Sequence, residues 1–229
     1  QAMNSFASTI SALPFSAPTQ DLYSRVFDAI LEQRIDAHSR FTEDSLAQLF
    51  SVRRSDIRGV LTRLSHQHVI VLRANHRPRV AVLDGEQTRQ MLHARRLTEV
   101  TLMRLVCQQP RPQDLQPLRD LVASERECTA PGAAIRLAGE FHLCLAQMAG
   151  NAPLAHFLGS LVPLSSLAIA QSGARLAEDC AWSVHAQMLA AVEGRNAEVA
   201  VALLNRHLDQ LEERLLNPQP TLIRNRVAG

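Results

Sequence analysis

The sequence predicts a mainly α-helical protein with one short β-hairpin in its N-terminal third. Apolar residues make up 46% of the 229 residues but aromatic residues only 4%. The core must therefore consist chiefly of Leu, Val and Ala, a composition that favours helices over sheet. Apolar residues recur at helical spacing through most of the chain. The exception is one stretch that contains two neighbouring runs of β-branched residues.

Four segments are expected along the chain. Residues 1–18 are expected to form a flexible arm, and residues 218–229 are expected to form a tail. Between them, residues 19–83 predict a helical unit that includes the hairpin, and residues 84–217 predict a unit made only of helices. A chain of this length is long enough for two such units, each with its own core.

Three helices are expected before the hairpin, the first over residues 20–34, where apolar residues follow helical spacing. Thr42 is a candidate N-cap for the second, shorter helix because a threonine hydroxyl accepts hydrogen bonds from the first free backbone N–H groups. Leu46, Leu49 and Phe50 are expected to form the buried face of that short helix.

A break and a basic helix follow the short helix. Residues 51–52 are expected to end it, and residues 53–66 to form a third helix that carries four arginines. The β-branched runs 69–73 and 79–83 then predict two strands joined by a basic tip. Two helices joined by a tight turn and followed by a hairpin predict a winged helix-turn-helix.

Six more helices are expected after residue 84. Apolar residues at helical spacing alternate there with Pro- and Gly-containing breaks. The expected ranges are 87–107, 114–128, 133–149, 153–172, 178–193 and 196–216.

Neither a secreted nor a membrane protein is expected from this composition. The four cysteines are widely spaced and form no CxxC pair, which argues against a disulfide framework and a zinc finger. Pro14 and Pro18 interrupt the start of the chain, which lacks a basic leader, and no uninterrupted run of 18 apolar residues occurs. We therefore expect a soluble cytoplasmic protein.

Positive charge is concentrated in the N-terminal unit. Residues 50–80 contain seven arginines and one aspartate, whereas the chain from residue 84 onward contains 14 arginines and 15 acidic residues. All 24 basic residues of the chain are arginine. A basic patch on an otherwise neutral protein predicts a polyanionic partner at that end.

The start of the third helix holds the candidate base-contacting residues. Arg54 and Arg58 lie four residues apart on one helical face, and arginine binds the O6 and N7 atoms of guanine with two hydrogen bonds in the major groove. The alternative is an arginine-rich face that only contacts water. The other residues expected at double-stranded DNA are Arg53, Ser55, His76 and Arg79.

Three histidines lie on predicted inward stripes of three C-terminal helices. His142, His185 and His207 each share a face with apolar residues. A buried neutral imidazole needs a polar partner, and one divalent metal, Zn or Ni, would satisfy all three. The alternative for each histidine is a core residue with a local hydrogen bond.

Three segments carry a resemblance to a known family. The segment LAQLFSVRRSDIRGVLTRLSHQHVI resembles the winged helix-turn-helix of GntR-family regulators. The segments FHLCLAQMAGN and HAQMLAAVEGRNAEVAVALLNRHL resemble the FCD ligand-binding domain of the FadR-type subgroup. The resemblance covers residues 20–216. It implies a regulator with a DNA-binding unit followed by a helical sensor that binds an effector and, in many relatives, a metal.

The resemblance also assigns individual roles. Arg54 and Arg58 match the DNA-contacting arginines of the family. The stretch that begins with Arg95 and Arg96 matches one in which an arginine often faces the effector pocket, where its guanidinium would bind the carboxylate of a small organic acid. The alternative for each of these two arginines is a surface ion pair with Glu99.

Three positions depart from the family pattern. Asp44 occupies a position where some relatives have an arginine, and Arg77 replaces a glycine usual in the hairpin turn. Ala138 replaces an aspartate four residues before the first histidine, where many relatives have a fourth metal ligand. These departures predict a different operator and a weaker metal site with a coordination position left for water or the effector.

An effector-responsive transcriptional regulator is therefore expected, acting as a repressor and a homodimer on a two-fold operator, and not as an enzyme. One alternative is a metal-dependent hydrolase that uses the three histidines to activate water. The sequence shows no general acid or base beside these histidines, which argues against this alternative. Another is a helical RNA adaptor, which the lack of aromatic residues among the arginines disfavours.

Overall fold

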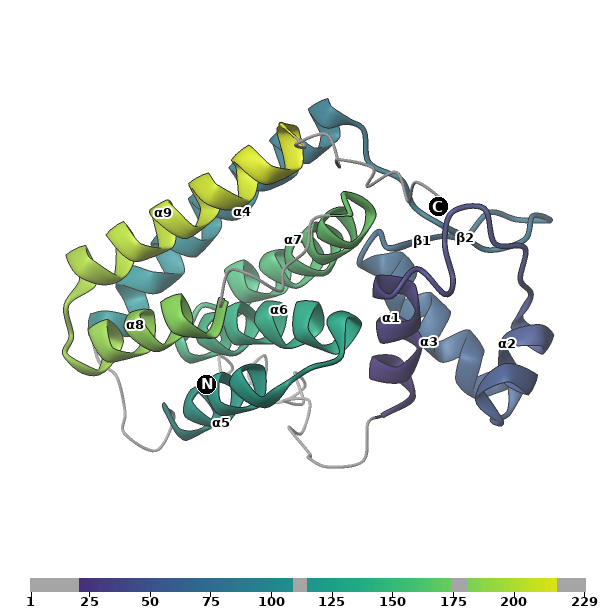
Figure 1. Ribbon diagram of the computed structural model, residues 1–229, viewed down its shortest axis with the longest axis horizontal. Coiled ribbons are helices and arrows are strands. Elements are labelled where there is room, and N and C mark those ends of the chain that lie inside the picture. Colours follow the sequence, from purple (N-terminus) through teal and green to yellow (C-terminus); the bar gives the residue numbers. More distant parts are fainter. Residues whose placement is uncertain (1–20, 109–114, 174–180, 218–229) are drawn as a thin grey trace, which may run out of the picture.

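The computed structural model describes residues 21–108, 115–173 and 181–217, which are mainly helical (Figure 1). The predicted arm at 1–18 and tail at 218–229 lie outside these ranges. The described elements are α1 (Leu22–Leu31), α2 (Glu43–Phe50), α3 (Arg54–His66), β1 (Ile70–Val71), β2 (Arg79–Val80), α4 (Gly85–Gln108), α5 (Gln116–Glu127), α6 (Pro131–Met148), α7 (Ala152–Gln171), α8 (Ala181–Glu193) and α9 (Ala197–Leu216).

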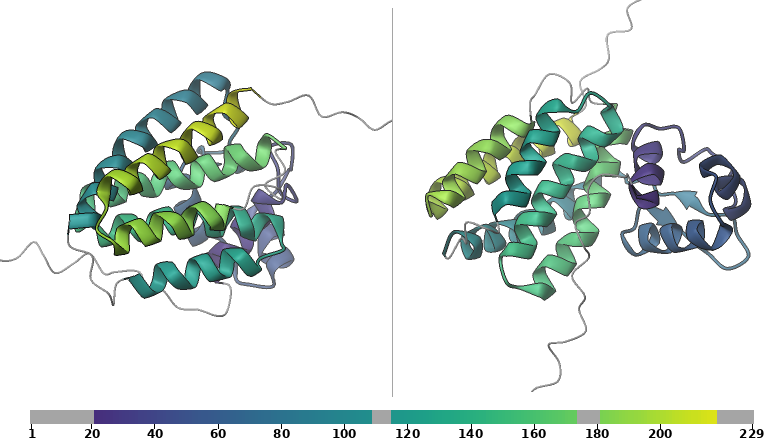
Figure 2. Two further views of the ribbon diagram at one scale, coloured as in Figure 1. Left: turned by 60° about the vertical axis from the view of Figure 1, so that its left-hand side comes forward. Right: turned by 90° about the horizontal axis from the view of Figure 1, so that it is seen from below.

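Helices α4 to α9 form a bundle, and α1 to α3 lie with the hairpin at one end of it (Figure 2). Helix α4 packs along α9 and α7, while α6 lies against α7, α5 and α1. Helix α8 packs on α9 and α5. The fold class predicted from the sequence is confirmed, whereas the boundary at residues 83 and 84 stays a prediction.

The turn between α2 and α3 follows from its capping residues. The Thr42 hydroxyl accepts a hydrogen bond from the backbone N–H of Ser45, and the Ser45 hydroxyl accepts one from the Thr42 N–H. Ser51 adopts a left-handed conformation with φ of 56° and ends α2. Arg53 then occupies the N-cap of α3. The predicted cap and break are both confirmed.

The predicted buried face of α2 is wrong at one position. Leu46 and Phe50 are buried with Ala47, but Leu49 is 63% exposed. Successive residues of an α-helix are about 100° apart, so Leu49 points well away from the direction shared by these three. A helix of only two turns buries a single narrow stripe.

The hairpin is shorter than the sequence predicts. The two strands pair antiparallel, with Ile70 opposite Val80 and Val71 opposite Arg79. Only Ile70 and Val80 face the core. Pro78 has no N–H with which to extend the ladder, and Val82 is 66% exposed. Although Val69 is also buried, Leu72 and Val82 of the longer runs are exposed, so burial does not favour longer strands at these positions.

A buried ion pair joins α1 to α6. The Arg136 guanidinium donates hydrogen bonds to both oxygens of Asp28, at 2.6 and 3.2 Å, and to Glu140 at 2.7 Å. At Gly132, a Cβ atom would lie 2.7 Å from the backbone oxygen of Asp28 and 2.6 Å from the Glu32 Cγ. Only glycine permits this close approach of the two helices.

Helix α7 is long and apolar enough to span a membrane by length and composition alone. It has 20 residues and a mean hydropathy of 1.5 over the relevant window, 44% of which is buried in the fold. Its residues Leu158, Val162 and Leu167 are at most 1% exposed and pack into the cores. Core helices of this kind also meet the composition test, so α7 is weak evidence for a membrane span.

Candidate metal centre and nucleic-acid interface

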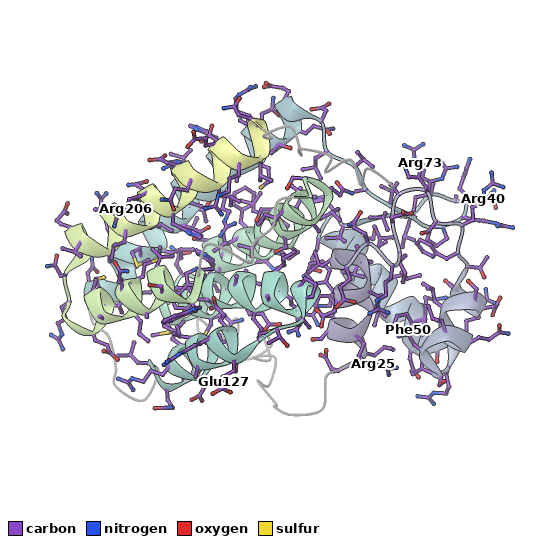
Figure 3. The ribbon with its side chains drawn as sticks, viewed as in Figure 1. Arg25, Arg40, Phe50, Arg73, Glu127 and Arg206 are labelled. Carbon is purple, nitrogen blue, oxygen red and sulfur yellow. The ribbon has the colours of Figure 1, made fainter. Side chains whose placement is uncertain are left out.

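The six residues predicted at DNA are all exposed in the N-terminal unit. Arg53 caps α3, and Arg54, Ser55 and Arg58 lie in its first two turns; His76 and Arg79 belong to the hairpin. Two further arginines of this unit, Arg40 and Arg73, also point outward (Figure 3). They lie outside the third helix and the predicted turn, so the motif alone did not single them out.

Glu43 binds both of the arginines expected to contact bases. Its carboxylate accepts hydrogen bonds from Nε of Arg54 at 2.8 Å and from Nη2 of Arg58 at 2.9 Å. Hydrogen bonds from Arg58 and then Arg54 lower the pKa of Glu43 to about 2. Glu43 therefore holds the two guanidinium groups side by side, whereas Asp44 lies 3.5 Å from Arg54 alone.

The hairpin turn does not need a glycine at position 77, where this chain has Arg77. The residue with positive φ is Asn75, at 60°, a conformation that asparagine tolerates better than most residues. His76 follows it, and its Nδ1 lies 2.8 Å from the Ala74 carbonyl oxygen, to which an Nδ1–H would donate. Arg77 is thus compatible with the turn, and its exposed side chain is available to a phosphate.

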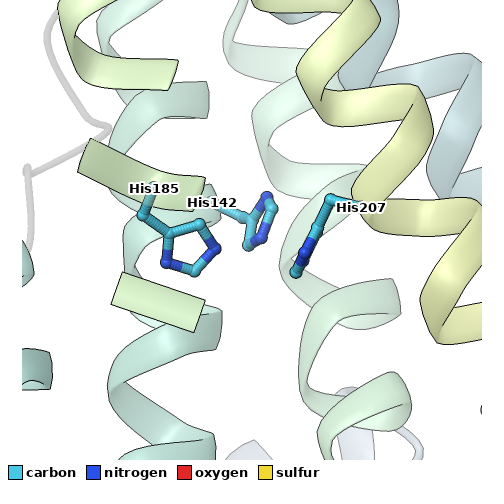
Figure 4. Close-up of side chains that lie close together, drawn as sticks. All are labelled: His142, His185 and His207. Atoms are coloured by element: carbon cyan, nitrogen blue, oxygen red, sulfur yellow. The ribbon is translucent and has the colours of Figure 1, made fainter. Parts of the chain in front are cut away.

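The three predicted histidines come together inside the bundle (Figure 4). They come from α6, α8 and α9, and one nitrogen of each ring lies within 4.8 Å of the other two. His142 and His185 are buried, while His207 is half-buried. The cluster thus offers one ring nitrogen from each of three helices to a metal ion.

Carboxylates hold two of the three rings from behind. The Nδ1 of His142 lies 2.6 Å from Glu99, and the Nδ1 of His185 lies 2.9 Å from Glu125. When each Nδ1–H donates to its carboxylate, the Nε2 lone pair is left for a ligand, the usual outer-shell arrangement of metal-binding histidines. The Nε2 of His185 is buried without a hydrogen-bond partner among the described residues.

Burial keeps the imidazoles neutral. It lowers the pKa of His142 to about 4 and that of His185 to about 3, and it lowers the pKa of His207 as well. Neutral imidazoles are the form that binds a metal. The donor set and the orphaned nitrogen of His185 therefore fit a divalent ion.

The two carboxylates that contact the imidazole rings, Glu99 and Glu125, have pKa values shifted in opposite directions. Burial alone would raise the pKa of Glu99, but Arg95 and His142 outweigh it and hold that pKa far below its usual range. Burial raises the pKa of Glu125 to about 7. Two carboxylates therefore lie beside the histidines, where the sequence predicted no general acid or base, and both contact Nδ1 and so orient the rings.

Of the two arginines expected to bind an effector, Arg95 lines the cavity and Arg96 does not. Arg95 is 3% exposed, forms an ion pair with Glu99, donates to the Ser165 hydroxyl at 2.6 Å and lines a cavity beside the histidines. Its pair with Glu99 is buried, not at the surface. Arg96 instead binds Asn205 and Asp209 of α9, at 3.0 and 2.6 Å, and is not among the residues that line this cavity.

The cavity has a volume of about 1140 Å³ and is partly open. His142 and His207 line one part of it, and Ala138 lies on its wall. An aspartate at position 138 would have placed a carboxylate in this space. Alanine leaves that space to water or to a ligand group.

Comparisons with known proteins agree with this arrangement. A family model described as the FCD domain matches residues 90–210. The Nta operon transcriptional regulator of Aminobacter aminovorans is 25% identical over 178 residues, which cover 76% of this chain and 85% of that protein.

Solved structures share the fold. The structure of E. coli McbR/YncC matches with a TM-score of 0.68 at 16% identity, over 84% of this chain and 94% of that one. A putative transcriptional regulator GntR from Rhodococcus sp. RHA1 matches with a TM-score of 0.69 at 17% identity, over 86% and 96%. Both likenesses extend over most of the chain.

Proposed function

Because the chain belongs to the FCD-domain family of GntR-type transcriptional regulators, we propose that residues 19–83 bind an operator and residues 84–217 sense an effector. The observation that carries the first half is the pair Arg54 and Arg58, exposed on one face of α3 and fixed by Glu43. Arginine pairs of this kind suit guanine in the major groove.

The second half rests on the three-histidine cluster. We propose that His142, His185 and His207 hold Zn²⁺ or Ni²⁺, and that the ion, when bound, supplies a Lewis-acidic centre for a carboxylate. Glu99 and Glu125 orient two of the rings, and Ala138 leaves room for the ligand. Arg95 positions Glu99 through their buried ion pair and lines the cavity.

A homodimer on a two-fold operator, acting in the cytoplasm, completes the proposal. Effector binding needs only a difference in affinity between two arrangements of the DNA-binding units to shift operator occupancy. Release of the operator, and therefore repression, is the expected response and stays a prediction. The alternative of a metal-dependent hydrolase gains no support from the Aminobacter aminovorans relative or the Rhodococcus structure, which are described as transcriptional regulators.

Arg54→Ala tests the DNA-binding proposal. The variant should lose about 1–3 kcal/mol of affinity for sites selected from randomised duplexes and relax the preference at one base pair. Fluorescence anisotropy at fixed salt measures the affinity, and repeated selection measures the preference. Arg104→Ala, an exposed arginine of α4, is the control. Unchanged affinity and preference in Arg54→Ala would refute the assignment of α3.

Glu43→Gln tests whether the carboxylate positions the two arginines. The variant removes one negative charge from the DNA-binding face, so affinity for unselected DNA should rise several-fold and its salt dependence should steepen by about one phosphate contact. The ratio of specific to non-specific affinity should fall because the arginines lose their fixed spacing. Competition binding at two salt concentrations measures both quantities.

Asp44→Asn is the matched control for Glu43→Gln. It removes the same charge from the neighbouring residue, which lies within 4 Å of Arg54 alone. A purely electrostatic role of Glu43 predicts the same loss of specificity in both variants. Equal behaviour of the two variants would therefore contradict the positioning role.

A further inference from the structure

The cavity beside the histidines is elongated. On α6 its lining residues recur at one-turn intervals from His142 through Ala138 and Ala134 to Pro131. His142 follows Pro131 by eleven positions on α6, so the cavity extends roughly 16 Å along this helix at 1.5 Å per residue. Helix α9 lines it in the same way, from His207 to Arg214.

The far end of the cavity reaches the DNA-binding unit. Leu31, the last residue of α1, and Glu32 after it both line the cavity. Helix α6 begins next to these residues because Gly132 packs against α1. A ligand that fills the cavity would therefore touch the histidine centre and α1 at once.

The two ends of the cavity differ in charge and polarity. At the histidine end, Arg95 and Glu99 cancel each other and Ala138 carries no charge. Even with Glu125 ionised, a divalent ion held there would keep at least one uncompensated positive charge, which favours an anionic ligand group. Toward α1 the wall carries the charged Glu32 and a group of apolar residues, which are Leu31, Ala134, Ile135, Ile169 and Ala170.

We propose that the effector is an elongated amphipathic acid, whose carboxylate lies at the three histidines and whose acyl or aryl body lies along α6 toward Leu31. This inference rests on the proposed function. Small-molecule sites usually measure roughly 300–1000 Å³, and this cavity exceeds that range at about 1140 Å³. A compact polyacid would fill the charged end and leave the apolar part without a partner.

The chain contains a natural reporter for this test. Trp182 is its one tryptophan, lines the cavity and lies under the Arg126 guanidinium, 5.3 Å from the ring centre. A ligand in the cavity should change the fluorescence of Trp182. The change does not depend on DNA, so it separates effector binding from regulation.

The experiment titrates the zinc-loaded full chain with butanoate, octanoate, dodecanoate and citrate, measured by Trp182 fluorescence and calorimetry. Because each buried methylene adds affinity, dodecanoate should bind at least about tenfold more tightly than butanoate. Citrate or butanoate binding as tightly as dodecanoate would overturn the proposal. If no acid binds although Arg54→Ala weakens operator binding as expected, this inference fails and the regulator proposal stands.

Ala134→Leu separates cavity binding from adsorption to the surface. A leucine at this position occupies the apolar part of the cavity, so dodecanoate affinity should fall about tenfold while butanoate affinity stays unchanged. Ala170→Leu, on the opposing helix α7, repeats the test should the first variant be unstable. Ala190→Leu, at an exposed site of α8, is the control. Equal loss for both acids, or no loss for either, would refute the placement of the ligand body.

Discussion

His185→Ala is expected to abolish metal retention. The Nε2 of His185 is the buried nitrogen without a partner among the described residues, and its ring is held from behind by Glu125. Loss of an outer-shell partner alone typically lowers metal affinity by about 10–100-fold, so loss of a ligand should lower it by more than about a hundredfold. Elemental analysis of purified protein and a thermal-shift titration with Zn²⁺ measure the effect.

The metal should also stabilise the fold, because an ion that binds only the folded state raises the free energy of unfolding. Zn²⁺ should raise the melting temperature of the wild type but not of His185→Ala. The Phe141 ring stacks on His185 at 4.3 Å, so the variant loses packing as well. His207→Ala, at the half-buried histidine, tests the ligand set with less loss of packing.

His156→Ala is the control for both variants because His156 is exposed on α7, away from the cluster. It should keep the metal and the response to Zn²⁺. A wild-type protein that contains no metal as purified and takes up none on dialysis against Zn²⁺ or Ni²⁺ would remove the proposed site.

Asp28→Ala is expected to lower the free energy of unfolding by about 3 kcal/mol. The change leaves Arg136 buried in the junction between α1 and α6, with its ion pair to Glu140 but without the one to Asp28. Burial alone would lower the pKa of Arg136, but Asp28 and Glu140 outweigh it and raise that pKa, so the guanidinium stays charged. Urea unfolding followed by circular dichroism measures the loss.

Two further variants isolate the cause. Arg34→Ala removes the exposed ion pair with Glu32 and should change stability by less than about 0.5 kcal/mol. The double variant Asp28→Leu with Arg136→Met should recover most of the loss because it removes both buried charges. An Asp28→Ala variant as stable as the wild type would mean that the buried pair does not stabilise the junction.

Helical periodicity predicted the helices well because it is a local property. Each of the six expected C-terminal ranges corresponds to a helix, and the ends that fall on described residues differ by at most two residues. The expected starts at 114 and 178 lie outside the described residues. The errors arose where the environment decides the outcome. Leu49 has the spacing of a buried residue but lies outside the narrow stripe of a two-turn helix. In the β-branched runs, Leu72 and Val82 are exposed, so burial does not extend the strands there.

The three histidines could be predicted because each lies on the apolar stripe of its own helix. Their partners could not, because Glu99 lies 43 residues from His142 and Glu125 lies 60 residues from His185. No sequence spacing links residues so far apart. The pair of Arg95 and Glu99 has helical spacing, but its burial depends on how α4 packs against α7 and α9.

The Glu43 contact has a consequence for how quickly the protein finds its operator. A regulator searches the genome by binding, sliding along and leaving unrelated DNA, and each added cationic contact lengthens its stay at wrong sequences. Glu43 neutralises part of the charge of Arg54 and Arg58 in the free protein. Under the proposed function, bases would replace Glu43 at the correct site, and the protein would combine a short residence on unrelated DNA with two arginines already ordered for the operator.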